Sequence, residues 1–340
     1  MFTATALMPD QLTSAMRRRG LVALLVSTFF AWGGFFLVIP LIAVHYVDQL
    51  GWTAASVGLV LAVRQFAQQG LTTICGVVSD RLGPKPLICA GMLIRSAGFA
   101  AMAFADSYPR LMVSAVLAAV GGALFESPKA AAIAALTEPA TRPRFFALAG
   151  VVSGLGITLG TQAGALLIRA DFAAVALAGA ACYVVIFLVV ALLLPPVRVA
   201  SAEATLGGGL GLALRDRTFL LFLALLAGYW FAWTQFSLTL TLAATEIAGT
   251  ESAVAWIYGV NAAVTVGLGY LLPRLLERRL TPVAMLTAGT AVTAVGLGLA
   301  LRDRTFLLFL TLLAGYWFAW TQFSLTLTLA ATEIAGTESA

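Results

Sequence analysis

The sequence predicts an all-α protein that crosses a membrane several times. Hydrophobic residues make up 61% of the 340 residues and charged residues only 10%, whereas a soluble domain carries about 25% charged residues. A helix needs about 20 mostly apolar residues to cross the hydrocarbon core of a bilayer, and ten apolar runs of roughly that length follow one another. These observations exclude a water-soluble globular protein and predict about ten spans.

The ten predicted spans are separated by short segments that contain most of the charged residues. All charged residues except four lie outside the apolar runs. We therefore assign the stretches between the runs as connecting segments. The first run is too long for the apolar region of a secretory signal peptide, so we expect it to remain as a span. In order, the predicted spans are 21–44, 54–78, 86–104, 111–136, 146–168, 172–194, 219–243, 253–272, 282–299 and 306–330.

The distribution of Lys and Arg predicts a cytoplasmic N-terminus. With that orientation, thirteen basic residues lie in cytoplasmic segments, whereas the outside loops up to the eighth span hold only Arg110 and Arg169. Cytoplasmic loops of membrane proteins carry such an excess, so we expect a multi-pass protein of the bacterial inner membrane. The thirteen residues are Arg17, Arg18, Arg19, Arg81, Lys85, Arg142, Arg144, Arg198, Arg215, Arg217, Arg274, Arg278 and Arg279.

The turn between the second and third predicted spans carries the most informative motif. It reads Gly76-Val-Val-Ser-Asp80-Arg81-Leu-Gly83-Pro84-Lys85. Gly83 permits a backbone conformation that other residues resist, and Asp80 can cap or face the positive N-terminal end of a neighbouring helix. A tight turn alone would need Gly and Pro but not the Asp-Arg pair. The motif resembles the G-x-x-x-D-R-x-G-R-[KR] signature of the major facilitator superfamily, with Pro84 replacing the first basic residue. We expect this turn to act in conformational switching, through Gly76, Asp80, Arg81, Gly83 and Lys85.

Further stretches of the N-terminal half resemble the MdtH-type multidrug transporters, in the drug/proton antiporter branch of that superfamily. The resemblance covers residues from about 20 to 290. It implies the major facilitator fold, with twelve helices in two six-helix halves around a central cavity, and drug export coupled to protons. The stretches are Arg64-Gln-Phe-Ala-Gln-Gln-Gly70, Gly91-Met-Leu-Ile-Arg95-Ser-Ala-Gly-Phe99, Gly121-Gly-Ala-Leu-Phe-Glu-Ser-Pro-Lys129 and Arg144-Phe-Phe146.

Four ionisable side chains fall inside the predicted spans, where each charge costs about 2.5–3.5 kcal/mol near the centre. Arg64 and Arg95 are expected near mid-depth, and Glu126 towards the cytoplasmic side with Lys129 three residues later on the same helical face. A proton carrier must be an acid that can be both protonated and ionised, and Glu126 is the only acid well inside the first six spans. The alternative is a permanent ion pair that locks helices together.

Polar and aromatic residues near Arg64 and in the first span are candidates for the lining of a cavity. Such polar residues can also hydrogen-bond to other helices, and the aromatic residues can face lipid. The candidates are Gln65, Gln68, Gln69, Phe35 and Phe36. In the fifth span, the spacing of Gly154, Gly156, Gly160 and Gly164 predicts close helix packing.

The C-terminal part contains a nearly identical duplication. Residues 209–253 recur as 296–340 with 44 of 45 positions identical, the exception being Ala224 against Thr311. The period of 87 residues holds three predicted spans, so the second copy has the opposite orientation. So many identities exceed what the diverged repeats of transporter folds retain, and we interpret the repeat as a recent tandem duplication, a mis-assembled sequence or a cloning artefact. One sequence cannot prefer both orientations.

The predicted organisation is therefore a cytoplasmic N-terminus at 1–20, a complete six-helix half at 21–195, a central cytoplasmic loop at 196–217 and an incomplete C-terminal half at 218–340. The favoured interpretation is a secondary active transporter that exports drugs or other small amphipathic molecules with protons. One alternative is a truncated or mis-assembled membrane protein that does not transport, because its second copy is wrongly inserted. Another is an exporter of a different small metabolite.

Several other classes of protein are not expected. No H-E-x-x-H, P-loop or nucleophile elbow occurs, so we expect no enzyme. The three cysteines lie in separate apolar runs without metal-ligand spacing, and we expect neither a metal nor another cofactor. The net charge of +5 is explained by basic residues in the predicted cytoplasmic segments, so nucleic acid is not an expected partner. The expected partners are a small-molecule substrate, protons and the lipid bilayer, and the expected state is a monomer.

Overall fold

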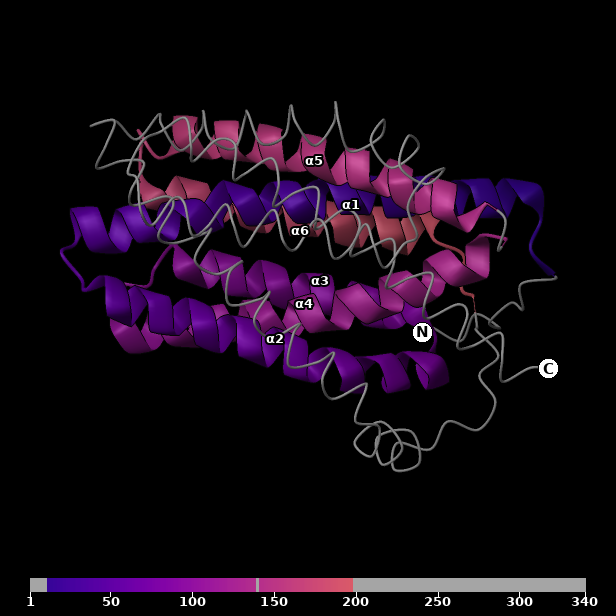
Figure 1. Ribbon diagram of the computed structural model, residues 1–340, viewed down its shortest axis with the longest axis horizontal. Helices are drawn as coiled ribbons and strands as arrows, with labels where there is room; N and C mark the ends of the chain where they lie inside the picture. The colour runs from indigo at the N-terminus through magenta and orange to yellow at the C-terminus, as the bar shows by residue number, and fades with distance from the viewer. Residues whose placement is uncertain (1–10, 139–140, 198–340) are drawn as a thin grey trace, which may run out of the picture.

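The computed structural model describes residues 11–138 and 141–197, which form a bundle of long helices lying roughly side by side (Figure 1). All six spans predicted for the N-terminal half are confirmed as helices. In a bilayer the backbone finds hydrogen-bond partners only within the protein, so continuous helices are required. The last four predicted spans and the duplication lie outside the described residues. The helices are α1 (Ser14–Ala43), α2 (Ala54–Leu82), α3 (Pro84–Met102), α4 (Tyr108–Leu136), α5 (Arg142–Leu167) and α6 (Phe172–Leu193).

The first helix begins before its predicted span, and its π-helical continuation ends after it. It begins at Ser14, where the Thr13 side chain accepts a hydrogen bond from the Met16 amide, and it therefore includes the basic residues placed in the predicted 1–20 segment. Past Ala43 it continues as a π-helix, η2 (Val44–Gln49). There the Tyr46 hydroxyl donates a hydrogen bond of 2.8 Å to the Ala105 carbonyl. Apolarity marks only the lipid-crossing part of a helix, whereas capping and packing decide its ends.

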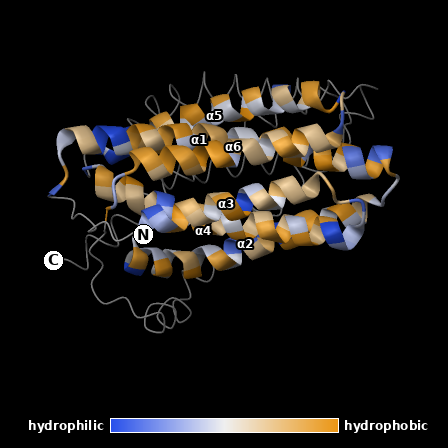
Figure 2. Cartoon of the chain, turned by 180° about the vertical axis from the view of Figure 1, so that it is seen from behind, coloured by the Kyte–Doolittle hydropathy of each residue, from blue (hydrophilic) through white to orange (hydrophobic). Residues whose placement is uncertain are grey.

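The helices pack in the order α5, α1, α6, α3, α4 and α2, each against the next. This order is visible from top to bottom in Figure 1 and again from behind in Figure 2. The largest fully buried side chains include aromatic residues of five different elements, namely Phe36, Tyr46, Phe99, Phe125 and Tyr183. Helices that are distant in sequence therefore share one core.

Close packing of α5 against α1 depends on a glycine row. Gly156, Gly160 and Gly164 recur every four residues on one face of α5, and a Cβ atom at any of them would meet a backbone carbonyl oxygen of α1. Small residues allow two helix backbones to approach in this way within membranes. The predicted packing role of these three glycines is confirmed.

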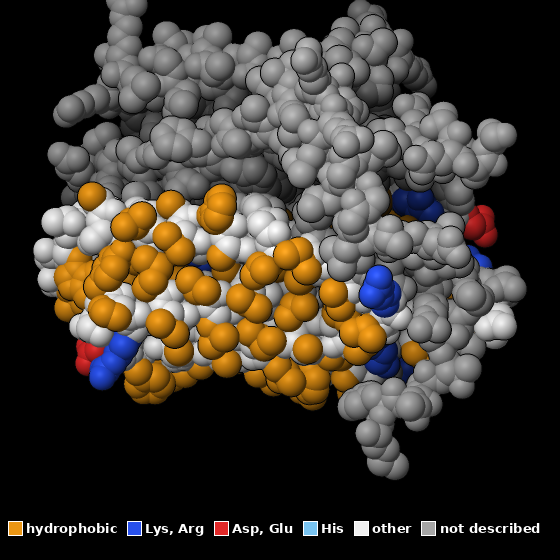
Figure 3. Space-filling model, turned by 90° about the horizontal axis from the view of Figure 1, so that it is seen from below, with side chains coloured by type: hydrophobic (Ala, Val, Ile, Leu, Met, Phe, Trp, Pro, Cys, Tyr) orange, Lys and Arg blue, Asp and Glu red, His pale blue; other side chains and the backbone are white. Residues whose placement is uncertain are grey.

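The surface of the bundle has the character of a membrane protein. Apolar side chains cover most of the described face in Figure 3, and charged side chains gather at its ends. Within the described residues, four helical segments are long and apolar enough to cross a membrane: Ser14–Gln49, Tyr108–Leu136, Arg144–Leu167 and Phe172–Leu193. Helix α2 is less apolar because it carries Arg64 and three glutamines, and α3 because it carries Arg95. Both arginines face the interior of the bundle.

Candidate functional site

Two arginines from consecutive helices are buried in the bundle. Arg64 lies in the first half of α2 and Arg95 in the second half of α3, with 6% and 5% of their surfaces exposed. Isolated charges avoid lipid because of the desolvation cost, which explains why both side chains point inwards. Both residues lie away from the ends of their helices, and their position near mid-depth of the bilayer stays a prediction.

Polar neighbours on α2 hold the Arg64 guanidinium. It donates hydrogen bonds of 2.7 Å to the Gln65 side-chain oxygen and 3.0 Å to that of Gln68. Its central carbon also lies 5.0 Å from the centre of the Phe35 ring on α1. The Arg95 guanidinium carbon is 5.7 Å from the same ring and 5.0 Å from the ring of Tyr183 on α6. Four helices therefore contribute to one arginine cluster, defined here as Arg64, Arg95, Gln65, Gln68, Phe35 and Tyr183.

The arginine cluster carries two positive charges that no described carboxylate balances. The ion pairs among the described residues involve neither arginine, and the Nε atoms of both are buried without a hydrogen-bond partner there. The ring faces of Phe35 and Tyr183 offset part of this cost, because a cation over an aromatic face gains about 0.5–2 kcal/mol. The arrangement can attract an anionic group and repel a cation.

Glycines on α4 bring the arginine cluster close to Glu126. A Cβ atom at Gly122 would lie 2.5 Å from an Arg95 Nη atom and 2.8 Å from the Gln68 side-chain oxygen. Glu126 follows Gly122 by four residues, and positions four apart share one face of a helix. The acid and the cluster are therefore about one helical turn apart along α4.

Glu126 and Lys129 form an ion pair in which the Lys129 Nζ lies 3.2 Å from the Glu126 Oε2. The Glu126 side chain is 38% exposed and that of Lys129 only 14%. The Lys129 Nζ also lies 4.8 Å from the centre of the Phe125 ring. The predicted contact at a spacing of three residues is present, and it lies within α4. This pair does not by itself join two helices, as the locking alternative would require.

The other candidates for a cavity lining differ in their environments. Phe36 is 1% exposed and stacks on Trp32 at 6.0 Å between ring centres, so it packs in the core and lines no open space in this conformation. Gln69 is half-buried on α2. Tyr183 was not predicted from the sequence, because a tyrosine within an apolar run carries no signal that distinguishes it from core residues.

The motif turn has the geometry that its glycine predicts. Gly83 ends α2 and precedes α3 with φ of +83°, a region that residues with a Cβ atom rarely adopt, and Pro84 then starts α3. A Cβ atom at Gly76 would lie 2.8 Å from the Ser127 Oγ on α4, so this glycine sets the close approach of α2 to the residue after Glu126.

The charged residues of the turn have different surroundings. Arg81 is exposed and Lys85 half-buried, while the side chain of Asp80 lies outside the described residues. Burial lowers the pKa of Lys85, and the nearby positive charge of Arg19 adds to that effect. The turn therefore places Lys85 close to the basic start of α1.

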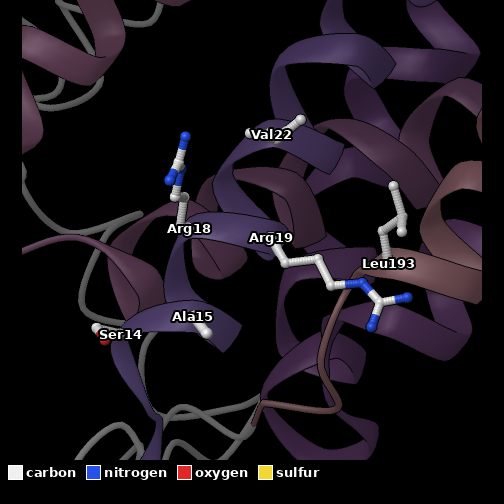
Figure 4. A pocket seen from close by; sticks show the side chains of 6 residues that line it. All are labelled: Ser14, Ala15, Arg18, Arg19, Val22 and Leu193. Atoms are coloured by element: carbon white, nitrogen blue, oxygen red, sulfur yellow. The ribbon is translucent and has the colours of Figure 1, made fainter.

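A separate pocket lies where the start of α1 meets the end of α6 (Figure 4). It was not predicted from the sequence, because its two walls are more than 170 residues apart and only folding brings them together. Its volume is about 510 Å³, and it is lined by Ser14, Ala15, Arg18, Arg19, Val22 and Leu193.

Comparison with known proteins identifies the class of this bundle. The model of the Major Facilitator Superfamily matches residues 24–340. The multidrug resistance protein MdtH of Aeromonas hydrophila is 37% identical over 289 residues, which cover 85% of this chain and 73% of that protein. MdtH of Yersinia pestis is 40% identical over 286 residues, covering 84% of this chain and 71% of that protein.

Solved structures show the same fold at low sequence identity. A bacterial homologue of the human drug peptide transporters PepT1 and PepT2 aligns with a TM-score of 0.71 and 17% identity, over 94% of this chain and 84% of that chain. A bacterial homologue of the human lysosomal transporter Spinster aligns with a TM-score of 0.65 and 17% identity, over 92% and 76% of the two chains.

The chain belongs to the Major Facilitator Superfamily. It is a multi-pass membrane transporter that takes small-molecule substrates, a class distinct from enzymes, and it is similar to the MdtH multidrug resistance proteins. The resemblance to this family and the major facilitator fold predicted from the sequence are thereby confirmed.

Proposed function

We propose that this transporter exports drugs or other small amphipathic molecules across the bacterial inner membrane in exchange for protons, as a monomer with a cytoplasmic N-terminus. The multidrug resistance function named for its MdtH relatives supports the substrate class. The observation that carries the coupling is the Glu126–Lys129 pair, since Asp80 at the end of α2 is the only other acid within the six described α-helices.

Glu126 has the two properties that a proton carrier needs. Its side chain is partly exposed, so protons can reach it, and its carboxylate lies 3.2 Å from a positive charge, the Lys129 Nζ. Protonation removes the attraction within the pair and leaves Lys129 over the Phe125 ring. Proton binding and release therefore change the charge on one face of α4.

Contacts of α4 link this charge change to the rest of the bundle. Ser127, next to Glu126, lies close to Gly76, which begins the motif on α2. One turn earlier, Gly122 adjoins Arg95 and Gln68 of the arginine cluster. A small movement of α4 would thus alter its contacts with the motif on α2 and with the buried arginines. Proton binding would in this way favour one conformation of the alternating-access cycle over the other.

A dye-efflux assay tests the proposal directly. Cells of a host deprived of its own exporters are loaded with a fluorescent amphipathic dye, and retention is compared with and without the full chain. We expect faster dye loss that a protonophore abolishes. Equal retention in both strains, with the protein present in the membrane, would favour the non-transporting alternative suggested by the duplication. Efflux that survives the protonophore would remove proton coupling but keep export.

A further inference from the structure

The pocket between α1 and α6 combines positive charge with an apolar wall. Ser14, Arg18 and Val22 follow one another at intervals of four residues on α1, and Leu193 lines the pocket from α6. Figure 4 shows the Arg19 side chain extending from α1 towards Leu193, while Arg18 points in a different direction from the same turn. The volume of about 510 Å³ falls within the range of about 300–1,000 Å³ that is typical of small-molecule sites.

The positive charge at the pocket is not neutralised by described residues. Arg18 and Arg19 are both exposed, and no ion pair among the described residues involves either one. Arg19 donates a hydrogen bond of 3.1 Å to the Leu192 carbonyl, which ties its guanidinium to the end of α6. Lys85 is a third basic residue near Arg19: burial lowers the pKa of Lys85, and the positive charge of Arg19 adds to that effect. Mutual repulsion among these cations favours an anion in the pocket.

The apolar wall indicates an amphipathic ligand. Val22 is 47% exposed and Leu192, beside Leu193, is 71% exposed, and both lie at the border between the basic end and the apolar surface of the bundle. This end is the one predicted to face the cytoplasm, where anionic lipids attract clustered Lys and Arg residues. A free phosphate ion would leave the apolar wall without a partner.

We propose that this pocket binds the headgroup of an anionic phospholipid from the cytoplasmic leaflet, with its phosphate at Arg18 and Arg19 and its acyl chains along Val22 and Leu192. Anionic lipid would thereby fasten the start of α1 to the end of α6. The site is separate from the arginine cluster and from Glu126, so its occupancy can be measured without transport.

Native mass spectrometry of the full chain, titrated with phosphatidylglycerol or phosphatidylcholine, tests the site. We expect preferential retention of phosphatidylglycerol, and in R18Q/R19Q a loss of affinity of about fivefold for each arginine, from the attraction of one basic residue to an anionic surface. R18K/R19K should keep the preference, because lysine binds phosphate as a point charge. The matched control is R110Q/R169Q, which removes two exposed arginines from the opposite end of the bundle and should leave affinity unchanged.

The outcomes separate a lipid site from the alternatives. Equal retention of both lipids by the unmodified chain, or an equal loss in both double variants, would overturn the proposal. Displacement of phosphatidylglycerol by inorganic phosphate at millimolar concentration would show a free-phosphate site and also contradict it. If R18Q/R19Q does not fold, V22D places a negative charge in the pocket with both arginines kept, and undiminished binding of phosphatidylglycerol to V22D would refute the assignment.

Discussion

Arg64 and Arg95 share one aromatic ring: their guanidinium carbons lie 5.0 and 5.7 Å from the centre of Phe35. The two residues are 31 positions apart on consecutive helices, and α1 supplies the ring that both contact. Because described residues provide no carboxylate at this point, the rings of Phe35 and Tyr183 and the glutamine oxygens make burial of two cations tolerable. Phe35 therefore contributes to the electrostatics of the bundle as well as to its packing.

Replacement of Phe35 by Leu should destabilise the bundle. The change removes two cation–π contacts and leaves a partial cavity, which together cost about 2 kcal/mol. Thermal unfolding of the detergent-solubilised chain measures the effect. Phe66→Leu is the matched control, because Phe66 lies on α2 close to Arg64 in sequence but is 83% exposed. If both variants unfold at the same temperature, the shared ring has no special role.

Gly122→Ala should disturb the contact between α4 and the arginine cluster. The added methyl group would fall 2.5 Å from an Arg95 Nη atom and 2.8 Å from the Gln68 oxygen, so we expect a loss of about 1–3 kcal/mol in stability from overpacking. The control is Gly70→Ala, where the new Cβ atom meets nothing within 4 Å. That variant should be neutral or more stable by up to about 1 kcal/mol. Two equally stable variants would mean that the helices do not meet here as described.

Glu126→Gln should abolish proton-driven dye efflux while the protein still inserts in the membrane. Gln keeps the size of the side chain but cannot release a proton, so net coupled transport stops, whereas exchange of labelled for unlabelled substrate should continue. Proteoliposomes with an imposed pH gradient measure both activities. The control is Asp171→Asn, an exposed acid just before α6. Unchanged gradient-driven efflux in Glu126→Gln would end the carrier hypothesis.

Gly83→Val and Asp80→Asn should slow transport without weakening substrate binding. Gly83 has φ of +83°, and a β-branched residue there is strained by about 1–2 kcal/mol, which alters the turn and leaves distant contacts intact. Substrate affinity is measured by fluorescence titration and turnover by efflux rate. Gly51→Val is the control, because Gly51 also has positive φ, +71°, but lies in the turn before α2, at the opposite end of that helix from Gly83. A selective loss of affinity in Gly83→Val would contradict a role in conformational switching.

The sequence by itself determined the class of the protein and the course of its N-terminal half. Apolar runs of the length of a bilayer core located all six described helices, because lipid allows the backbone no other partner. The rarity of charge in these runs singled out Arg64, Arg95, Glu126 and Lys129. The contact between Glu126 and Lys129 was also predictable, since residues three apart on a helix are neighbours.

Only the tertiary structure decided which residues from different helices meet. The Phe35 ring, the Tyr183 ring and Gly122 come from three helices, and nothing in an apolar run indicates which of its faces will meet an arginine of another helix. The same holds for the pocket at Arg18 and Arg19, whose opposite wall is Leu193. Helix periodicity is a local property of the chain, whereas the pairing of helix faces depends on how side chains of the whole bundle fill space together.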